Sequence, residues 1–375
     1  MPTVEVVRDL RSLAALQLPW NRLLAESAAD TVFLTWEWVL AWWGMKGGAG
    51  EEPFVLAVRD GDRLVGIAPL RLRTRRLAGA LPLRILEFAP REVSDCSDVV
   101  AAAGREPEVC AALADFLAGE ARGAWDVWRL TEVPEESPTW RSLPAGLGDR
   151  GLPCRHQPGS VRPYASLADG WEAYLATRST KFLKRVRWER RHAHRSFAVE
   201  LRCVTEREDL HRHLDRLLEL QARQWGGRSA IADDPRFRAF HARFFDLAAA
   251  EGWPRMYALH FDSRLVGVQY WLEHSSILSY YQSGQDPDYD RWSVGTLLLH
   301  EVIEAGAATG VREVDLLRGD EAYKSNWATG VRCNCDVVVW GCILVGALAR
   351  VFDGLRRRLT RRRRREEEGS DPVAR

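Results

Sequence analysis

The chain has 375 residues, of which 46% are hydrophobic and 28% charged, and its 53 basic and 52 acidic residues almost cancel. This composition excludes a disordered or collagen-like protein, and the balanced charge gives no chain-wide field that would select DNA. The longest uncharged apolar run, 337–349, is too short to span a bilayer. Because the seven cysteines are odd in number and scattered, and no secretory signal is visible, we expect a cytoplasmic protein with reduced thiols.

The N-terminal half is predicted to begin with a strand, 3–7, and two helical stretches, 10–27 and 35–45. A β-hairpin is predicted at 54–72, because two alternating apolar runs flank an Asp-Gly turn. The predicted elements that follow are strand 81–88, helix 107–121, strand 125–130 and a final helix and strand.

The second half repeats this order, and both hairpins contain the sequence RLVG, at 63–66 and 264–267. Its predicted elements are strand 197–204, helices 206–225 and 234–251, hairpin 256–272, strand 277–283, helix 295–309, strand 313–317, short helix 321–327 and strand 336–340. The repeat predicts an α/β (α+β) fold with two units, each a mixed, mostly antiparallel sheet flanked by helices. Prolines and glycines at 151–163 predict the boundary, which gives domains at 1–158 and 163–350 and a tail at 351–375.

A strongly basic helix is predicted between the two units, at 170–195. Helical spacing places one set of residues on a single side: Lys181, Lys184, Arg185, Trp188, Arg191, His192 and Arg195. This side is either a solvated face or a platform for an anionic substrate.

A strand, a polar loop and a helix follow one another at 283–299, where the helix opens on small residues. Ser293, Val294, Gly295 and Thr296 would place unpaired backbone N–H groups and a positive helix end at one point. Such a point suits a phosphate or pyrophosphate, although an ordinary turn with a helix cap gives the same pattern.

Polar and aromatic residues are dense after the strand at 313–317. Acid–base catalysis needs one group that takes a proton and one that gives a proton. Asp320 or Glu321 is a candidate base, Tyr323 a candidate acid, and Lys324 either a catalytic or anion-binding group or an ion-pair partner of a neighbouring carboxylate. The predicted substrate-binding residues are Tyr281, Arg318 and Trp327, and Tyr280 and Tyr281 point to opposite faces of their strand.

The sequence SVGTLL resembles the acyl-CoA pyrophosphate loop of the GNAT-superfamily N-acetyltransferases. In this alignment Gly295 matches the second glycine, Ser293 replaces the first, Asp290 takes the Gln/Arg position, and Arg291 follows it as a further donor-binding candidate. The segments FLTWEWVLAWW, SYYQSGQDPDYDRWSVGTLLLHEVIEAG and VREVDLLRGDEAYKSNWATG are similar to the CelD/BcsL-type acetyltransferases.

This resemblance implies a tandem GNAT fold related to the Fem-type aminoacyltransferases and an acetyl-CoA or other acyl-CoA donor. It also implies an amino sugar or small amine as acceptor, in envelope or exopolysaccharide biosynthesis. Because the first half has no counterpart of the phosphate loop, only the C-terminal unit is expected to bind the donor. Two alternatives are an aminoacyl-tRNA-dependent, Fem-like peptidyltransferase, with the basic helix gripping RNA, and a degenerate acyltransferase that serves as a scaffold.

No metal site is predicted. Asp286, Asp288 and Asp290 lack the glycine and glutamate of a calcium loop, and the short His and Cys pairs lack a second pair at zinc spacing. In the tail, an apolar stripe at 343–359 accompanies many arginines. We expect either a docked helix with a disordered end or a contact with an anionic membrane surface.

Overall fold

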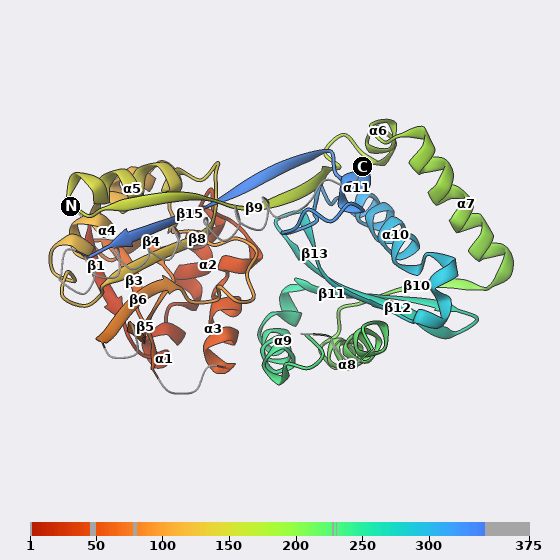
Figure 1. Ribbon diagram of the computed structural model, residues 1–375, viewed down its shortest axis with the longest axis horizontal. Coiled ribbons are helices and arrows are strands. Elements are labelled where there is room, and N and C mark those ends of the chain that lie inside the picture. Colours follow the sequence, from red (N-terminus) through yellow and green to blue (C-terminus); the bar gives the residue numbers. More distant parts are fainter. Residues whose placement is uncertain (1, 46–49, 78–80, 227–228, 230, 342–375) are drawn as a thin grey trace, which may run out of the picture.

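Figure 1 shows the computed structural model, which describes residues 2–45, 50–77, 81–226, 229 and 231–341. The two halves of the chain lie side by side, and each combines strands with helices as the repeat predicts. The tail and its apolar stripe lie outside the described residues. Among the described helices, none has the length and apolar character needed to cross a membrane.

The N-terminal half divides its strands between two sheets. The smaller sheet contains β1 (Thr3–Val7), β3 (Val55–Asp60), β4 (Arg63–Ala68) and β7 (Val100–Ala101), all antiparallel. Strands β2 (Glu51–Pro53), β5 (Leu70–Leu77), β6 (Leu81–Phe88) and β8 (Val127–Pro134) join the larger sheet. Because Pro69 has no N–H to donate, the predicted second strand of the first hairpin is interrupted there and changes sheets.

The helices of this half are α1 (Leu10–Ala14), α2 (Gln17–Ala25), α3 (Trp36–Met45), α4 (Glu106–Ala118) and α5 (Pro138–Asp149). The tryptophan-rich helix α3 packs against the C-terminal half. Trp38 is fully buried and makes edge-to-face contacts with Phe240 and Phe244, both with ring centroids 4.8 Å apart. The tryptophans of α3 therefore form core between the halves and no open stacking surface.

In the C-terminal half, β10 (Val199–Val204), β11 (Pro254–Phe261), β12 (Arg264–His274) and β13 (Ile277–Gln285) are antiparallel neighbours. Strand β14 (Glu313–Asp315) then pairs with β13 in parallel. In Figure 1, α8 (Arg207–Gln224) and α9 (Pro235–Ala248) lie on one side of this sheet, and α7 (Thr180–Ser196) and α10 (Val294–Ala308) lie on the other. The basic segment forms two helices, α6 (Trp171–Ala176) and α7, because Ser179 caps α7 by accepting from the N–H of Phe182.

Two long strands join the halves (Figure 1): β9 (Cys154–Ser166) and β15 (Gly330–Trp340). They pair with each other antiparallel; β9 also pairs with β14, and β15 also pairs with β8. The parallel pair of each half is therefore bordered by a strand from the other half, and one eleven-stranded sheet runs through both. The segment 151–163, where the boundary is predicted, is mostly strand β9, so the chain passes from one half to the other in an extended strand.

Candidate active site

Strands β13 and β14 part shortly after they meet. Their parallel pairing covers only Ile277–Ser279 and Glu313–Asp315, whereas β13 continues to Gln285. A β-bulge lies in β13, because Trp271 pairs with Tyr280 and the next partner, Tyr270, pairs with Gln282. The extra residue, Tyr281, changes which side chains share a face of the strand.

A cavity of about 360 Å³, here called the β13 cavity, lies beside the part of β13 that continues beyond its pairing with β14. Its lining residues come from α7, α8, β13, α10 and the segment around α11 (Lys324–Trp327): Arg185, Gln224, Tyr280, Ser283, Gln285, Ser293, Gly295, Thr296, Leu299, Tyr323, Asn326 and Trp327. The bulge explains why Tyr280, Ser283 and Gln285 face the same space.

The first turn of α10 opens onto this cavity. Ser293 precedes the helix in the left-handed conformation, at φ 50°, and its hydroxyl donates to Glu189 at 3.1 Å. The N–H of Gly295 donates to Oε1 of Gln285 at 2.9 Å. A Cβ on Gly295 would meet that same oxygen at 2.9 Å, so this glycine keeps the approach to the helix end open.

The structure brings Ser293, Gly295 and Thr296 together at the cavity, as expected for a phosphate-binding turn. Val294 instead packs into the core, where a Cβ on Gly267 would lie 2.7 Å from its Cγ1. Arg291 is exposed, with its guanidinium 5.3 Å above the ring of Trp292, and it does not line the cavity.

Of the three predicted catalytic residues, only Tyr323 lines the β13 cavity. Burial beside Tyr280 and Glu321 raises the pKa of its hydroxyl, which therefore keeps its proton at neutral pH. Asp320 is exposed and is not part of the lining.

Lys324 is buried, and its Nζ contacts other groups of the chain. It donates to the carbonyl oxygens of Leu317 at 3.3 Å and Arg318 at 2.6 Å, and it pairs with Glu321 at 2.9 Å. Leu317 has a positive φ of 58°, a strained conformation for a branched side chain. Lys324 therefore stabilises the turn that leads away from β14, in agreement with the ion-pair alternative.

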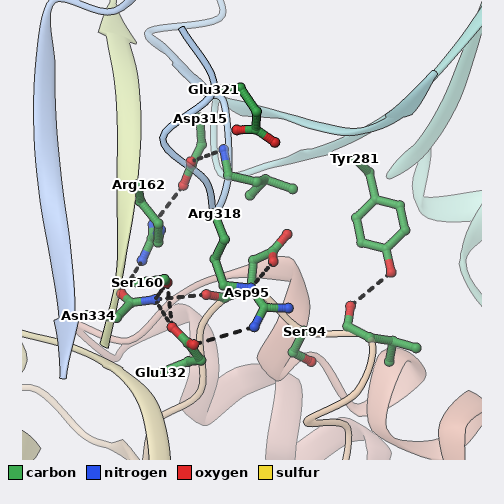
Figure 2. Close-up of polar contacts among 12 residues, drawn as sticks. Ser94, Asp95, Glu132, Ser160, Arg162, Tyr281, Asp315, Arg318, Glu321 and Asn334 are labelled. Carbon is green, nitrogen blue, oxygen red and sulfur yellow. Dashed lines mark hydrogen bonds and ion pairs between the residues drawn. The ribbon is translucent and has the colours of Figure 1, made fainter. Parts of the chain in front are cut away.

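The predicted substrate-binding residues do not lie together in the structure. Trp327 lines the β13 cavity and packs edge-to-face on Phe182 at 4.8 Å. Tyr281 points the other way, toward the N-terminal half, where its hydroxyl donates to the carbonyl of Val93 at 2.9 Å (Figure 2). Tyr280 is the tyrosine of this pair that lines the β13 cavity, and Tyr281 is not part of the lining.

Arg318 belongs to a polar cluster between the halves, here called the interface cluster: Asp95, Glu132, Ser160, Arg318 and Asn334 (Figure 2). Arg318 donates to Asp95 and, at 3.4 Å, to Glu132. Asn334 donates to the carbonyl of Asp95 and to Glu132, each at 2.9 Å. Burial raises the pKa of Asp95 although Arg318 opposes it. Arg318 thus holds the two halves together, and no motif in the sequence indicates the other members.

A second cavity, of about 380 Å³ and here called the interface cavity, lies between the halves. Ile277 and Ser279 of β13 and Glu313 and Asp315 of β14 line it just before the strands part. Besides the Cys96 thiol, its ionisable lining residues are five acidic and three basic groups: Asp30, Asp98, Glu136, Glu313, Asp315, Arg162, His274 and Arg332. Each basic group has an acidic partner: Arg162 pairs with Asp315, Arg332 with Glu313 and His274 with Asp30. Two acidic groups, Asp98 and Glu136, are in excess, which favours a cationic or amine-bearing ligand.

Within the described part of the chain, no group of three or more His, Cys, Asp or Glu side chains could hold a metal ion.

Residues 180–325 match the family model described as an acetyltransferase (GNAT) domain. This match lies within the C-terminal half and indicates a GNAT-type fold there. The matched segment contains β13, β14 and α10 and almost the whole of the β13 cavity. No curated protein matches the chain.

Solved structures extend the similarity of fold to both halves. FemX has a TM-score of 0.63 at 10% identity, over 88% of this chain and 97% of its own. The C-terminal domain of a putative lysylphosphatidylglycerol synthetase from Agrobacterium fabrum has a TM-score of 0.56 at 12% identity, over 92% and 96%. L-PGS from Bacillus licheniformis has a TM-score of 0.51 at 10% identity, over 86% and 90%. At these identities the likeness concerns the fold alone, which here is two GNAT-like units in tandem.

Proposed function

We propose that this protein is an acyl-CoA-dependent N-acyltransferase whose donor lies in the β13 cavity. The observation that carries the proposal is the cavity itself, where the first turn of α10, the end of β13 beyond its pairing with β14, and Tyr323 meet. An acyl-CoA has an anionic pyrophosphate for the helix end and an extended amide-containing arm for the strand edge. Its thioester would then lie beside Tyr323.

The charges around the cavity support an anionic donor. Arg185 is part of the lining, and α7 exposes further basic residues on the same side: Lys181, Lys184, Arg191 and Arg195. One carboxylate lies at the helix end: Glu189 accepts a hydrogen bond from Ser293. Its Oε1 is 3.9 Å from Nε of Arg185, which offsets its charge.

The first half offers no comparable site at the corresponding helix. The first turn of α4 contains Glu106, Pro107 and Glu108, whereas α10 has no acidic residue in its first turn. Carboxylates repel a phosphate, and proline has no N–H to donate. This contrast supports a single donor site for each chain, in the C-terminal unit.

In the proposed reaction the acceptor nitrogen attacks the thioester carbonyl carbon, and collapse of the tetrahedral intermediate breaks the carbon–sulfur bond. The acceptor ammonium loses one proton before the attack and the nitrogen loses a second one afterwards. The departing thiolate takes the proton of Tyr323, and the second proton from the nitrogen returns through solvent to the Tyr323 oxygen. The described residues that line the β13 cavity include no carboxylate and no imidazole. The predicted base therefore does not lie at the donor, and we propose that the first proton leaves toward the acceptor side.

We propose that the acceptor approaches from the interface cavity, which lies next to the point where β13 and β14 part. Its carboxylates would attract an amine before the amine is deprotonated. An amino sugar or a small amine of an envelope or exopolysaccharide pathway, the acceptor class that the resemblance implies, fits this chemistry. Acyl-CoA as donor also fits a cytoplasmic location.

A second candidate is transfer from an aminoacyl-tRNA, which the exposed basic side of α7 favours because it would suit a longer polyanion. The test is release of free thiol from acetyl-CoA in the presence of amino sugars and small amines, beside a binding titration with aminoacyl-tRNA. Amine-dependent thiol release supports the proposal. Salt-sensitive tRNA binding without thiol release favours the second candidate. If the protein neither releases thiol nor binds aminoacyl-tRNA, a scaffold is favoured.

A further inference from the structure

Two exposed aromatic side chains lie on or next to the lining of the β13 cavity. In the described part of the chain, three large aromatic side chains are exposed: Trp188 at 57%, Trp225 at 59% and Tyr323 at 43%. Tyr323 lines the cavity, and Trp188 lies one helical turn after the lining residue Arg185, whereas Trp225 follows the end of α8 and is not part of the lining. Exposed aromatic rings concentrated at one site mark a binding surface.

Trp188 is ordered by a stack of rings. It lies on His192, with centroids 5.0 Å apart and planes inclined by 14°, and His192 lies on Trp292 at 4.6 Å and 23°. Trp292 directly precedes Ser293, which caps α10 and lines the cavity. The stack therefore connects α7 to the helix end where a phosphate is expected, and Trp188 stays largely exposed.

The surroundings of the stack are cationic. Arg291 lies over the ring of Trp292. The side of α7 that carries Trp188 also carries exposed ammonium and guanidinium groups: Lys181, Lys184, Arg185, Arg191 and Arg195. An exposed ring beside positive charge is the arrangement by which proteins bind a nucleobase and its phosphates together. A neutral sugar would not need the charges.

We propose that Trp188 is the stacking platform for the adenine ring of the donor, with His192 and Trp292 holding the ring in place. The inference rests on the proposed function and adds a nucleoside subsite to it. Because the stack is already formed, binding costs little ordering of side chains. Adenosine with nearby phosphates occurs both in acyl-CoA and at the 3′ end of tRNA, so the experiment must separate the two sources.

The test measures binding of acetyl-CoA and of S-acetyl-4′-phosphopantetheine, which has the same acyl arm without adenosine. Wild type, Trp188→Ala and the matched control Trp225→Ala are titrated by calorimetry. Trp225 has the same exposure, and in the described part of the chain it makes no ring contact that would order it. We expect Trp188→Ala to weaken acetyl-CoA binding about tenfold and to leave the adenosine-free ligand unchanged.

Three results would overturn the inference. Trp188→Ala could weaken binding of both ligands equally, it could leave acetyl-CoA binding unchanged, or Trp225→Ala could weaken acetyl-CoA binding in place of Trp188→Ala. If the adenosine-free ligand still binds and reacts in each of these cases, the proposed function stands without the subsite. In one further case, wild type binds only an aminoacylated RNA hairpin. The subsite then stands if Trp188→Ala weakens binding of the hairpin that ends in adenosine and leaves binding of the hairpin without this adenosine unchanged. Any other result overturns the subsite. Binding of neither donor by wild type rejects the subsite and the proposed function together.

Discussion

The N–H of Gly295 donates to the side-chain oxygen of Gln285 at 2.9 Å, so a strand residue occupies the first turn of α10 in this structure. A helix N-terminus has N–H groups without partners in the helix, and Gln285 satisfies one of them. A donor phosphate at the same turn would have to displace this amide. If the donor binds as proposed, Gln285 links the stability of the protein to the affinity for the donor.

Replacing Gln285 with Glu separates these two effects. A carboxylate at a helix N-terminus stabilises by about 0.3–1 kcal/mol, so the melting temperature should rise. The same charge opposes a pyrophosphate, and the affinity for acetyl-CoA should fall roughly tenfold. Calorimetric titration and thermal unfolding of Gln285→Glu, with Gln282→Glu as the control on the same strand, measure both. Unchanged affinity in Gln285→Glu would argue against a phosphate at this turn.

Tyr323→Phe tests the proton donor. The change removes one hydroxyl from a side chain that is 43% exposed, so folding should persist. Loss of a general acid costs about 10²–10⁴-fold in rate, and we expect turnover to fall by that factor with donor affinity kept. Because burial raises the pKa of Tyr323, the hydroxyl stays protonated beyond its ordinary range, and the wild-type rate should show no loss from this group below about pH 10. A Phe variant with full turnover would exclude Tyr323 from the chemistry.

Arg318→Ala should destabilise the protein because it leaves Asp95 and Glu132 without their cation between the halves. Loss of one partner of a largely buried pair costs about 3 kcal/mol. The control is Arg216→Ala, whose pair with Glu219 is more than half exposed on both sides and should contribute less than about 1 kcal/mol. Urea unfolding measures both variants, and equal free energies of unfolding would contradict the role given to Arg318.

Asp98 predicts a pH dependence of stability. Burial raises the pKa of its carboxyl from 3.8 to about 6, so the folded state holds a proton that the unfolded chain releases. Stability from this group is therefore present below about pH 4 and is lost as the pH rises to about 6, by up to about 3 kcal/mol. Asp98→Asn should remove this loss and be more stable than wild type at pH 7, measured by urea unfolding across pH 4–8. The exposed variant Asp149→Asn is the control, and parallel pH profiles for Asp98→Asn and wild type would refute the assignment.

The sequence is sufficient to predict those helices and strands that a local residue pattern determines. Strands 3–7 and 81–88 and both hairpins are confirmed, because alternation and turn residues are local signals. The strand β9 is not visible in the same way, since Pro158, Gly159 and Pro163 predict turns. In the structure Gly159 has another role: a Cβ there would lie 2.8 Å from the carbonyl group of Asn334, so it permits close contact with β15. Such pairing across more than 170 residues leaves no local pattern.

The same distinction applies to the site. The turn with Ser293, Gly295 and Thr296 could be predicted because it is contiguous in the chain. The choice between Tyr280 and Tyr281 could not, because alternation gives opposite faces without saying which one meets the cavity. Lys324 looks available in the sequence, and only the three-dimensional turn shows that the carbonyls of Leu317 and Arg318 use it.

The central claim is one donor site for each chain, at the first turn of α10, and Gly295→Asp tests it most directly. The added Cβ meets only the flexible end of Gln285, and an acidic residue suits a helix N-terminus, so the variant should fold. Gly148→Asp is the matched control, because that helical glycine of the N-terminal unit is exposed with nothing within 4 Å of an added Cβ. Calorimetric titration with acetyl-CoA should show one site for each chain in wild type and Gly148→Asp, and at least tenfold weaker binding in Gly295→Asp. Two sites for each chain, or unchanged affinity in a folded Gly295→Asp variant, would contradict the account.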